Sequence, residues 1–239
     1  MPLYVYSITE KDHPLHLDGL SGVGTEPSPL RTVAAGALCA VVSDITEEIR
    51  PKRRDLTAHQ EVQDRLMADG VILPLQFGYI AGDDAAVRQA LEVNAENYLG
   101  ALKRLEGCAE YHVRASQADE APLLRQILQD VPEAGDLNDR IRGGDPDPSL
   151  PPALGEIVAR EVAVRQETLA AGLTETLARF SREYLTHPPS GTDFLNLSLL
   201  VPEEHKEDLQ TAEANLAREI GGDIDLRFSG PLPPYSFVQ

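Results

Sequence analysis

The chain has 239 residues, and its 39 Asp and Glu against 21 Lys and Arg give a formal net charge of −18. This acidic balance argues against sequence-independent binding to nucleic acid and to anionic membranes, because both need clustered Lys and Arg. The hydrophobic content of 42% is typical of a globular protein, and no apolar run approaches the roughly 18–20 residues that cross a bilayer.

The first half of the chain predicts strands and helices in mixed order. Residues 3–8 and 37–42 form β-prone apolar runs, with an additional edge strand near 30–33. A helix is expected from Asp55 or Thr57 to Gly70, followed by a short strand at 72–78. Pro74 cannot donate a ladder hydrogen bond, so it indicates a sheet edge or a bulge. One long amphipathic helix over 83–107 and a strand over 108–115 follow.

The second half is predicted to be richer in helix. The expected elements are a short helix at 121–131, a long helix at 154–184, a strand at 195–201, a helix after Pro202 and a final strand at 224–228. Residues 143–152, rich in Gly, Pro and Asp, indicate a linker or exposed loop.

These patterns predict an α+β fold with two domains. Residues 1–116 form a ferredoxin-like variant, a sheet with two packed helices, and residues 117–239 form a helix-rich α+β domain. The second domain includes the acidic, Pro-rich loop 143–152 and a Pro-rich tail at 230–239. It is also the more acidic part, since residues 116–239 hold 22 acids and 10 bases against 17 and 11 in residues 1–115.

Few residues suggest chemistry. The two cysteines, Cys39 and Cys108, fit small core hydrophobes and a reduced cytosolic compartment better than a disulfide framework. His13 and His16 form an H-x-x-H pair without a third ligand, so no metal site is predicted. No nucleotide-binding loop or nucleophile elbow is present, and no cofactor is expected.

One enzymatic alternative remains open. His59 follows Asp55 by one helical turn, so the pair is a conceivable general base in a cytosolic enzyme or ligand-binding protein. A surface or capping histidine is the competing interpretation.

A basic cluster stands out in this acidic chain, at Arg50, Lys52, Arg53 and Arg54. It is either a solvated loop before a helix or an electrostatic contact, with an acidic partner or with the acidic second half of the same chain.

The closing segment, Gly230-Pro-Leu-Pro-Pro-Tyr-Ser-Phe237, is also unusual. Its prolines hold the backbone extended. The tail either packs back on the body as a clasp or presents Tyr235 and Phe237 to a partner.

Several segments, taken in order, resemble the gas vesicle protein F/L family. They are Leu3–Ile8, Gly36–Ser43, Arg54-Asp55-Leu56 with His59 and Val62, Leu73–Gly78, Leu105-Glu106-Gly107 with Glu110-Tyr111, and Gly230–Phe237. The chain departs from the family pattern at Leu232, where a Trp is usual, and at Gln76, where an Arg is usual.

The resemblance implies a non-enzymatic accessory or minor structural protein of gas vesicles, located on the vesicle within the cytoplasm. Its implied partners are the major hydrophobic shell protein and other accessory proteins. The family supplies no catalytic residues. The candidate partner-binding residues are Arg50, Lys52, Arg53, Arg54, Pro74, Pro231, Pro233, Pro234, Tyr235 and Phe237.

Overall fold

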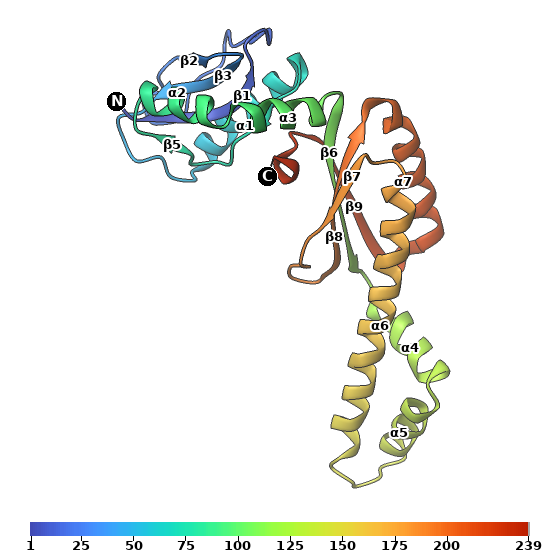
Figure 1. Ribbon diagram of the computed structural model, residues 1–239. Coiled ribbons are helices and arrows are strands. Elements are labelled where there is room, and N and C mark those ends of the chain that lie inside the picture. Colours follow the sequence, from blue (N-terminus) through green and yellow to red (C-terminus); the bar gives the residue numbers. More distant parts are fainter. Residues whose placement is uncertain (239) are drawn as a thin grey trace. The chain divides into compact units, whose positions relative to one another are not determined.

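The computed structural model describes residues 1–238 and divides the chain into two compact units. Unit 1 comprises residues 1–111, 200–203 and 230–239, and unit 2 comprises residues 112–199 and 204–229. Each unit combines helices with a sheet (Figure 1), so the predicted α+β class is confirmed.

Unit 1 is built on an antiparallel sheet of order β2-β3-β1-β4, with β5 also paired to β1. Its strands are β1 (Leu3–Glu10), β2 (Leu30–Ala35), β3 (Leu38–Asp44), β4 (Leu73–Pro74) and β5 (Ile80–Ala81). The predicted continuous strand over 72–78 is wrong beyond Pro74. Between β4 and β5 the chain leaves regular pairing, although Leu75 N–H still donates to the Tyr6 carbonyl and Tyr79 accepts from Val5.

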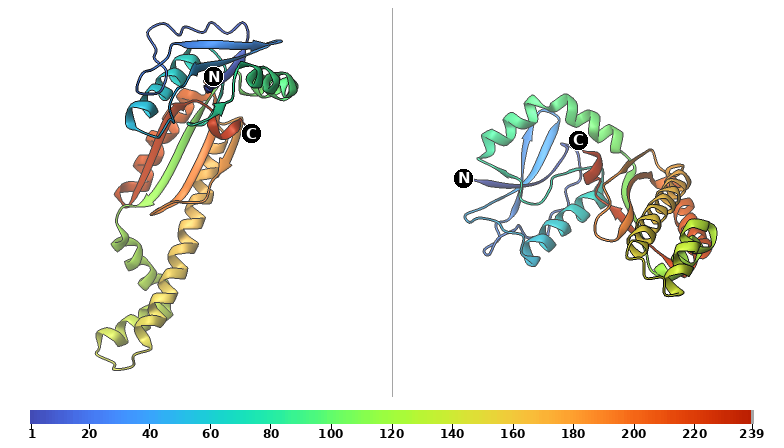
Figure 2. Two further views of the ribbon diagram at one scale, coloured as in Figure 1. Left: turned by 90° about the vertical axis from the view of Figure 1, so that its left-hand side faces the viewer. Right: turned by 90° about the horizontal axis from the view of Figure 1, so that it is seen from below.

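Helices cover both faces of this sheet, α1 (Arg53–Asp69) on one side and α2 (Asp84–Val93) with α3 (Ala95–Leu105) on the other (Figure 2, right). Strands β1 and β3 are therefore buried almost throughout, which explains their apolar character on both faces. A bulge in β1 between Val5 and Ser7 shifts the alternation, so that both Tyr6 and Ser7 contact the α1 side.

The single helix predicted over 83–107 is wrong, because the structure has two. Asp83 caps α2 as expected, its side chain accepting from the Ala86 N–H at 2.8 Å. At Asn94 the backbone leaves helical geometry, and the Asn94 side chain donates to the Ala90 carbonyl. Asn competes for backbone groups in this way, which is why it interrupts the otherwise continuous apolar stripe.

Unit 2 contains most of a second sheet, of order β7-β8-β6-β9. The strands are β6 (Cys108–Gln117), β7 (Glu183–Thr186), β8 (Asp193–Pro202) and β9 (Ile224–Leu232). The helices are α4 (Glu120–Asp130), α5 (Pro132–Arg142), α6 (Leu150–Ala178) and α7 (Lys206–Ile220). Part of α6 and all of α7 lie on one side of the sheet (Figure 1), while α4 and α5 pack on the first half of α6.

The predicted long helix is wrong at both ends. Helix α6 begins at Leu150, four residues early, because Pro151 and Pro152 are accepted in the first helical turn. It ends at Ala178, where the Ser181 hydroxyl donates to the Ala178 carbonyl, and residues 183–186 form strand β7 instead. Helix α5 is not predicted from the sequence, because its own apolar pattern is weak. Packing against α6 stabilises it in the structure.

The units also differ from the predicted division at residue 116. The boundary falls after Tyr111, inside β6, and residues 200–203 and 230–239 join unit 1. The physical reason is burial, since Leu200 and Phe237 belong to the apolar core that β1, β3, α2 and α3 form.

Candidate functional site

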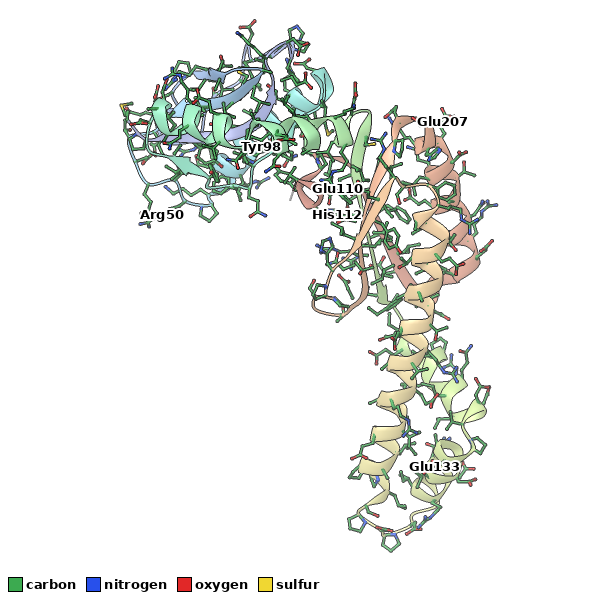
Figure 3. All side chains as sticks on the ribbon, viewed as in Figure 1. Arg50, Tyr98, Glu110, His112, Glu133 and Glu207 are labelled. Carbon is green, nitrogen blue, oxygen red and sulfur yellow. The ribbon has the colours of Figure 1, made fainter. Side chains whose placement is uncertain are left out.

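The basic cluster lies at the start of α1, in unit 1. Arg50 pairs with Glu48 at 3.0 Å, but both side chains are largely exposed, so this pair contributes little to stability. In Figure 3 the Arg50 side chain projects outward from the loop before α1. Lys52 and Arg53 are exposed and form no ion pair with any described residue.

These positive charges do not help α1 to form. A helix N-terminus favours negative charge, and here Lys52 occupies the N-cap position without a capping hydrogen bond, followed by Arg53 and Arg54. Asp55 is the acidic residue of the first turn, and Arg54 pairs with it at 3.0 Å. The cluster therefore opposes the helix dipole, and local folding gives no reason for it.

Asp55 itself is a buried structural group, only 2% exposed. Its carboxylate accepts the Gly24 N–H at 2.9 Å as well as the Arg54 guanidinium. It thereby holds the long loop between β1 and β2 against the helix. No hydrogen bond joins it to His59 in the described structure, so the pair assumed in the enzymatic alternative is not formed.

His59 is buried in a cluster of aromatic and polar side chains. Its Nδ1 lies 3.0 Å from the Tyr4 hydroxyl and its Nε2 lies 3.1 Å from the Tyr235 hydroxyl. The Tyr4 oxygen also accepts the Gly78 N–H at 3.0 Å, which leaves the Tyr4 proton for Nδ1. In this assignment Nε2 carries the histidine proton and faces Tyr235 and the Leu75 carbonyl.

Burial sets the charge of this histidine. Desolvation lowers the pKa of His59 to about 4, although a hydrogen bond to the Leu75 carbonyl acts in the opposite direction. The ring is therefore neutral at pH 7, whereas a general base works best with a pKa near the operating pH. The same burial raises the pKa of Tyr4 and Tyr235. The arrangement suits a fixed hydrogen-bond network better than proton transfer.

An open surface cavity of about 530 Å³ lies over His59. Its lining comes from one face of α1, from the segment after β4 and from the tail: Leu56, Thr57, His59, Gln60, Gln76, Phe77 and Tyr235. Leu56 is 43% exposed. Gln76, one of the two positions at which the sequence is expected to depart from the family pattern, thus lies at this surface.

The tail packs on unit 1. Pro233, Pro234 and Phe237 are buried, and the buried Glu110 carboxylate accepts from the Ser236 N–H at 2.9 Å and from its hydroxyl. Figure 3 labels Glu110 beside this segment. The contacts favour the clasp over free display, leaving Pro231 exposed and Tyr235 half-buried.

Gly230 permits the close approach that begins the clasp. Its φ is +153°, and a Cβ there would come within 2.6 Å of Tyr111 Cδ1 and 3.0 Å of the Glu110 carbonyl. A larger residue would force Tyr111 or the tail to move.

Pro74 lies in β4 at the border of the sheet, as its sequence context indicated, and pairs with Ser7 of β1. It is buried and does not line the cavity over His59. Of the partner-binding residues predicted from sequence, Tyr235 lines this cavity, whereas Pro74 and the basic cluster do not.

Sequence reasoning missed Gln63, which is fully buried. Its amide donates to the Tyr6 carbonyl at 2.6 Å and its oxygen accepts from the Ser7 hydroxyl. The signal was available: Gln63 lies on the same helical stripe as His59, Val62 and Leu66, and a polar residue on an apolar stripe needs a partner.

The other histidine pair has structural contacts. His13 Nε2 lies 3.1 Å from the Leu66 carbonyl, and His16 pairs with Asp69 at 2.9 Å. Among residues 1–238 there is no group of three or more His, Cys, Asp or Glu side chains arranged to hold a metal ion. No helix within that range has the length and apolarity needed to span a membrane.

Sequence comparison identifies relatives over the whole chain. A family described as "Gas vesicle synthesis protein GvpL/GvpF" matches residues 2–239. Gas vesicle protein F of Streptomyces sp. (strain CB03234) is 40% identical over 242 residues, covering 100% of both chains. Gas vesicle protein L1 of Halobacterium salinarum is 26% identical, covering 92% of this chain and 84% of that protein.

Solved structures share the fold. The crystal structure of GvpF from Anabaena sp. PCC7120 matches with a TM-score of 0.85, covering 100% of this chain and 98% of that one at 18% identity. GvpF from Microcystis aeruginosa gives a TM-score of 0.80, covering 100% and 99% at 21% identity. At these identities the likeness concerns architecture alone.

Proposed function

Because the chain belongs to the gas vesicle synthesis protein GvpL/GvpF family, we propose that it is an accessory or minor structural protein that binds the small hydrophobic shell protein and assists vesicle assembly. Membership gives a role related to gas vesicles. The shell protein as direct partner, contacts with other accessory proteins and residence on the vesicle within the cytoplasm are parts of the proposal.

The physical basis is the need to protect an apolar subunit. A protein that builds a gas-facing wall carries large apolar surfaces, which aggregate in water unless they are covered. A partner with a net charge of −18 keeps such a complex dispersed, because its charge opposes self-association. Binding of this kind requires a surface and no catalytic group.

The observation that carries the proposal is the start of α1. Lys52 and Arg53 are exposed cations that oppose the helix dipole, and Leu56, exposed on the same helix, borders the cavity over His59. Apolar contact beside positive charge suits a partner segment that is apolar and carries an acidic group. Tyr235 completes this surface, while the buried tail residues hold Tyr235 in place.

The test is co-purification of the tagged full chain with co-expressed shell protein, at low and high salt. Leu56→Asp is expected to reduce retention at both salt concentrations. The double variant Lys52→Glu with Arg53→Glu is expected to reduce it mainly at low salt, because exposed charges are screened. Lys103→Glu, an exposed charge reversal on α3, is the matched control.

The outcomes separate the parts of the proposal. Retention lost in Leu56→Asp with an unchanged melting temperature supports the α1 surface. Full retention of the shell protein by both variants would show that the start of α1 is not the binding surface. No retention of shell protein by the unmodified chain, with the shell protein shown to be soluble, removes the shell protein as partner and leaves only family membership.

A further inference from the structure

The sheets expose four borders in the described chain, and three of them are protected against adding a strand. Strand β2 carries Arg31, which pairs with Asp44 at 2.9 Å and with Asp84 at 2.7 Å. Strands β4 and β5 are two residues long, and one of the two residues of β4 is Pro74. Strand β9 carries the charged residues Asp225 and Arg227 and has Pro231 next to its last residue, Leu232. Short length, charge and proline are the usual protections of an exposed edge.

The fourth border, strand β7, is four residues long and has one charged residue, Glu183, at its start, but it contains no proline. It carries two exposed large apolar side chains, Tyr184 at 50% and Leu185 at 41% exposure. The left view of Figure 2 shows the β7–β8 hairpin, in orange, at one border of its sheet. Exposed apolar residues on an unpaired edge are costly for an isolated protein, and they are characteristic of binding surfaces.

The hydrogen bonding of the hairpin leaves a defined set of backbone groups available. The His187 N–H donates to the Asn196 carbonyl at 2.8 Å, so residue 187 faces β8. Backbone groups alternate sides along a strand, which turns those of Thr186 and Tyr184 outward, away from β8. An added strand would pair with these two residues.

A groove runs along this edge. It has a volume of about 820 Å³ and lies between α6 and the β7–β8 hairpin, all within unit 2. Tyr184 and Thr186 form its strand side. Ala170, Ala171 and Ala178 form part of its helix side, where small side chains leave room for the backbone and side chains of an extended peptide.

The charged side chains that line the groove are all negative. Glu167 and Glu175 on α6 line it, and no Lys or Arg does. Neither carboxylate forms an ion pair with a described residue. A strand that enters the groove therefore meets negative charge at both ends of a short apolar floor, and basic residues flanking an apolar centre complement it.

We propose that the β7 edge binds an extended segment of a partner protein as an additional strand, with small or β-branched apolar residues over the alanines and a Lys or Arg near Glu167 or Glu175. Main-chain hydrogen bonds supply affinity and the groove supplies selectivity, as in other cases of strand addition. The proposal is independent of the α1 surface and of the shell protein.

The probe is a fluorescein-labelled peptide, acetyl-Lys-Val-Ala-Val-Lys-amide, titrated into the full chain and followed by fluorescence anisotropy. Saturable binding is expected, weakened at least about tenfold by N-methylation of the central alanine or by replacement of both lysines with Glu. No saturation up to ~1 mM, with this peptide and with its Ile and Leu analogues, overturns the proposal.

Variants of the chain locate the site. Thr186→Pro removes an outward N–H without removing a bond to β8, and should weaken binding about tenfold. Glu175→Lys should weaken it in a salt-dependent way, while Glu156→Lys, exposed on the same helix outside the groove, serves as the control. Binding unaffected by both Thr186→Pro and Glu175→Lys places the peptide elsewhere and overturns the proposal.

Two further outcomes are informative. Sedimentation of the unmodified chain as a dimer that Thr186→Pro dissociates would assign the edge to a second copy, which contradicts a separate partner. Loss of peptide binding in Thr186→Pro with unchanged retention of shell protein would separate this site from the proposed function at α1.

Discussion

The two faces of the unit 1 sheet are buried to a similar degree but are built differently. The face under α2 and α3 is aliphatic, with Leu91, Leu102 and Leu105 packed on leucines and valines of the strands. The face under α1 includes Tyr4, Tyr6, Ser7, His59 and Gln63, joined by hydrogen bonds.

The difference teaches what each face contributes. Aliphatic packing stabilises in proportion to the buried area and is insensitive to pH. A buried polar network adds less net stability, but leaving any member without a partner is costly, so the network fixes one arrangement of α1 on the sheet. That arrangement positions the start of α1, where the proposed binding surface lies.

The largest effect is expected from opening a cavity on the aliphatic face. Leu102 is fully buried, and Leu102→Ala should lower the free energy of unfolding by about 2–5 kcal/mol at any pH between 5 and 8. Urea denaturation at two pH values measures this. A pH-dependent loss would contradict the contrast between the faces, and Leu56→Ala at the exposed side of α1 is the control.

A smaller, pH-dependent effect is expected from the face under α1. The pKa of His59 is about 4 in the folded chain and ordinarily 6.5, so the unfolded state binds the proton first as the pH falls. Stability is therefore fully present above pH 6.5 and declines toward pH 4, by on the order of 2–3 kcal/mol.

Three Asp residues contribute only at the acidic end of this window. The pKa values of Asp44 and Asp84 are lowered by Arg31, and that of Asp69 is raised by desolvation but lowered further by His16, so their contribution to stability is present above about pH 5 and begins to be lost only near the ordinary carboxyl pKa of about 4. His59→Gln is the matched variant. It should be less stable at pH 7 and should lose less stability between pH 6.5 and 4. Parallel curves for the two proteins would show that His59 does not titrate with the unfolding transition.

The smallest effect tests the link between the tail and the network. Tyr235→Phe removes one hydrogen bond to His59 and keeps the ring, so unfolding should become easier by about 0.5–1.5 kcal/mol. Thermal unfolding detects a shift of this size. An unchanged or raised melting temperature would mean that the Tyr235 hydroxyl adds nothing to the clasp, and Tyr184→Phe on an exposed strand is the control.

Sequence periodicity predicted the elements whose burial is regular. Strands β1, β3 and β8 and helices α1 and α7 were expected close to their observed bounds, because each presents a repeating apolar pattern. Periodicity failed where another interaction decided the outcome. Asn94 interrupts a continuous stripe, and residues 183–186 follow a helical spacing but pair with β8.

The site could be predicted only in pieces. The basic cluster and the tail were recognisable from composition. His59 was recognisable as a candidate because it follows Asp55 by one helical turn. That Tyr4 and Tyr235 meet at His59 depends on a contact across 176 positions of sequence, and that Ser7 reaches Gln63 depends on a bulge in β1. Neither leaves a local pattern. Charge alone also could not show that the Asp55 carboxylate already accepts the Gly24 N–H and pairs with the Arg54 guanidinium.

The tail's place in the core has a consequence for synthesis on the ribosome. Residues 1–111 emerge first, yet the core they form also takes Leu200 and Phe237, and the buried Glu110 carboxylate binds Ser236. Domains usually complete folding in the order in which they are made. Here the first-made unit completes its core only when Leu200 and Phe237 have also been made, so a chain that stops before them leaves part of that apolar core exposed to water.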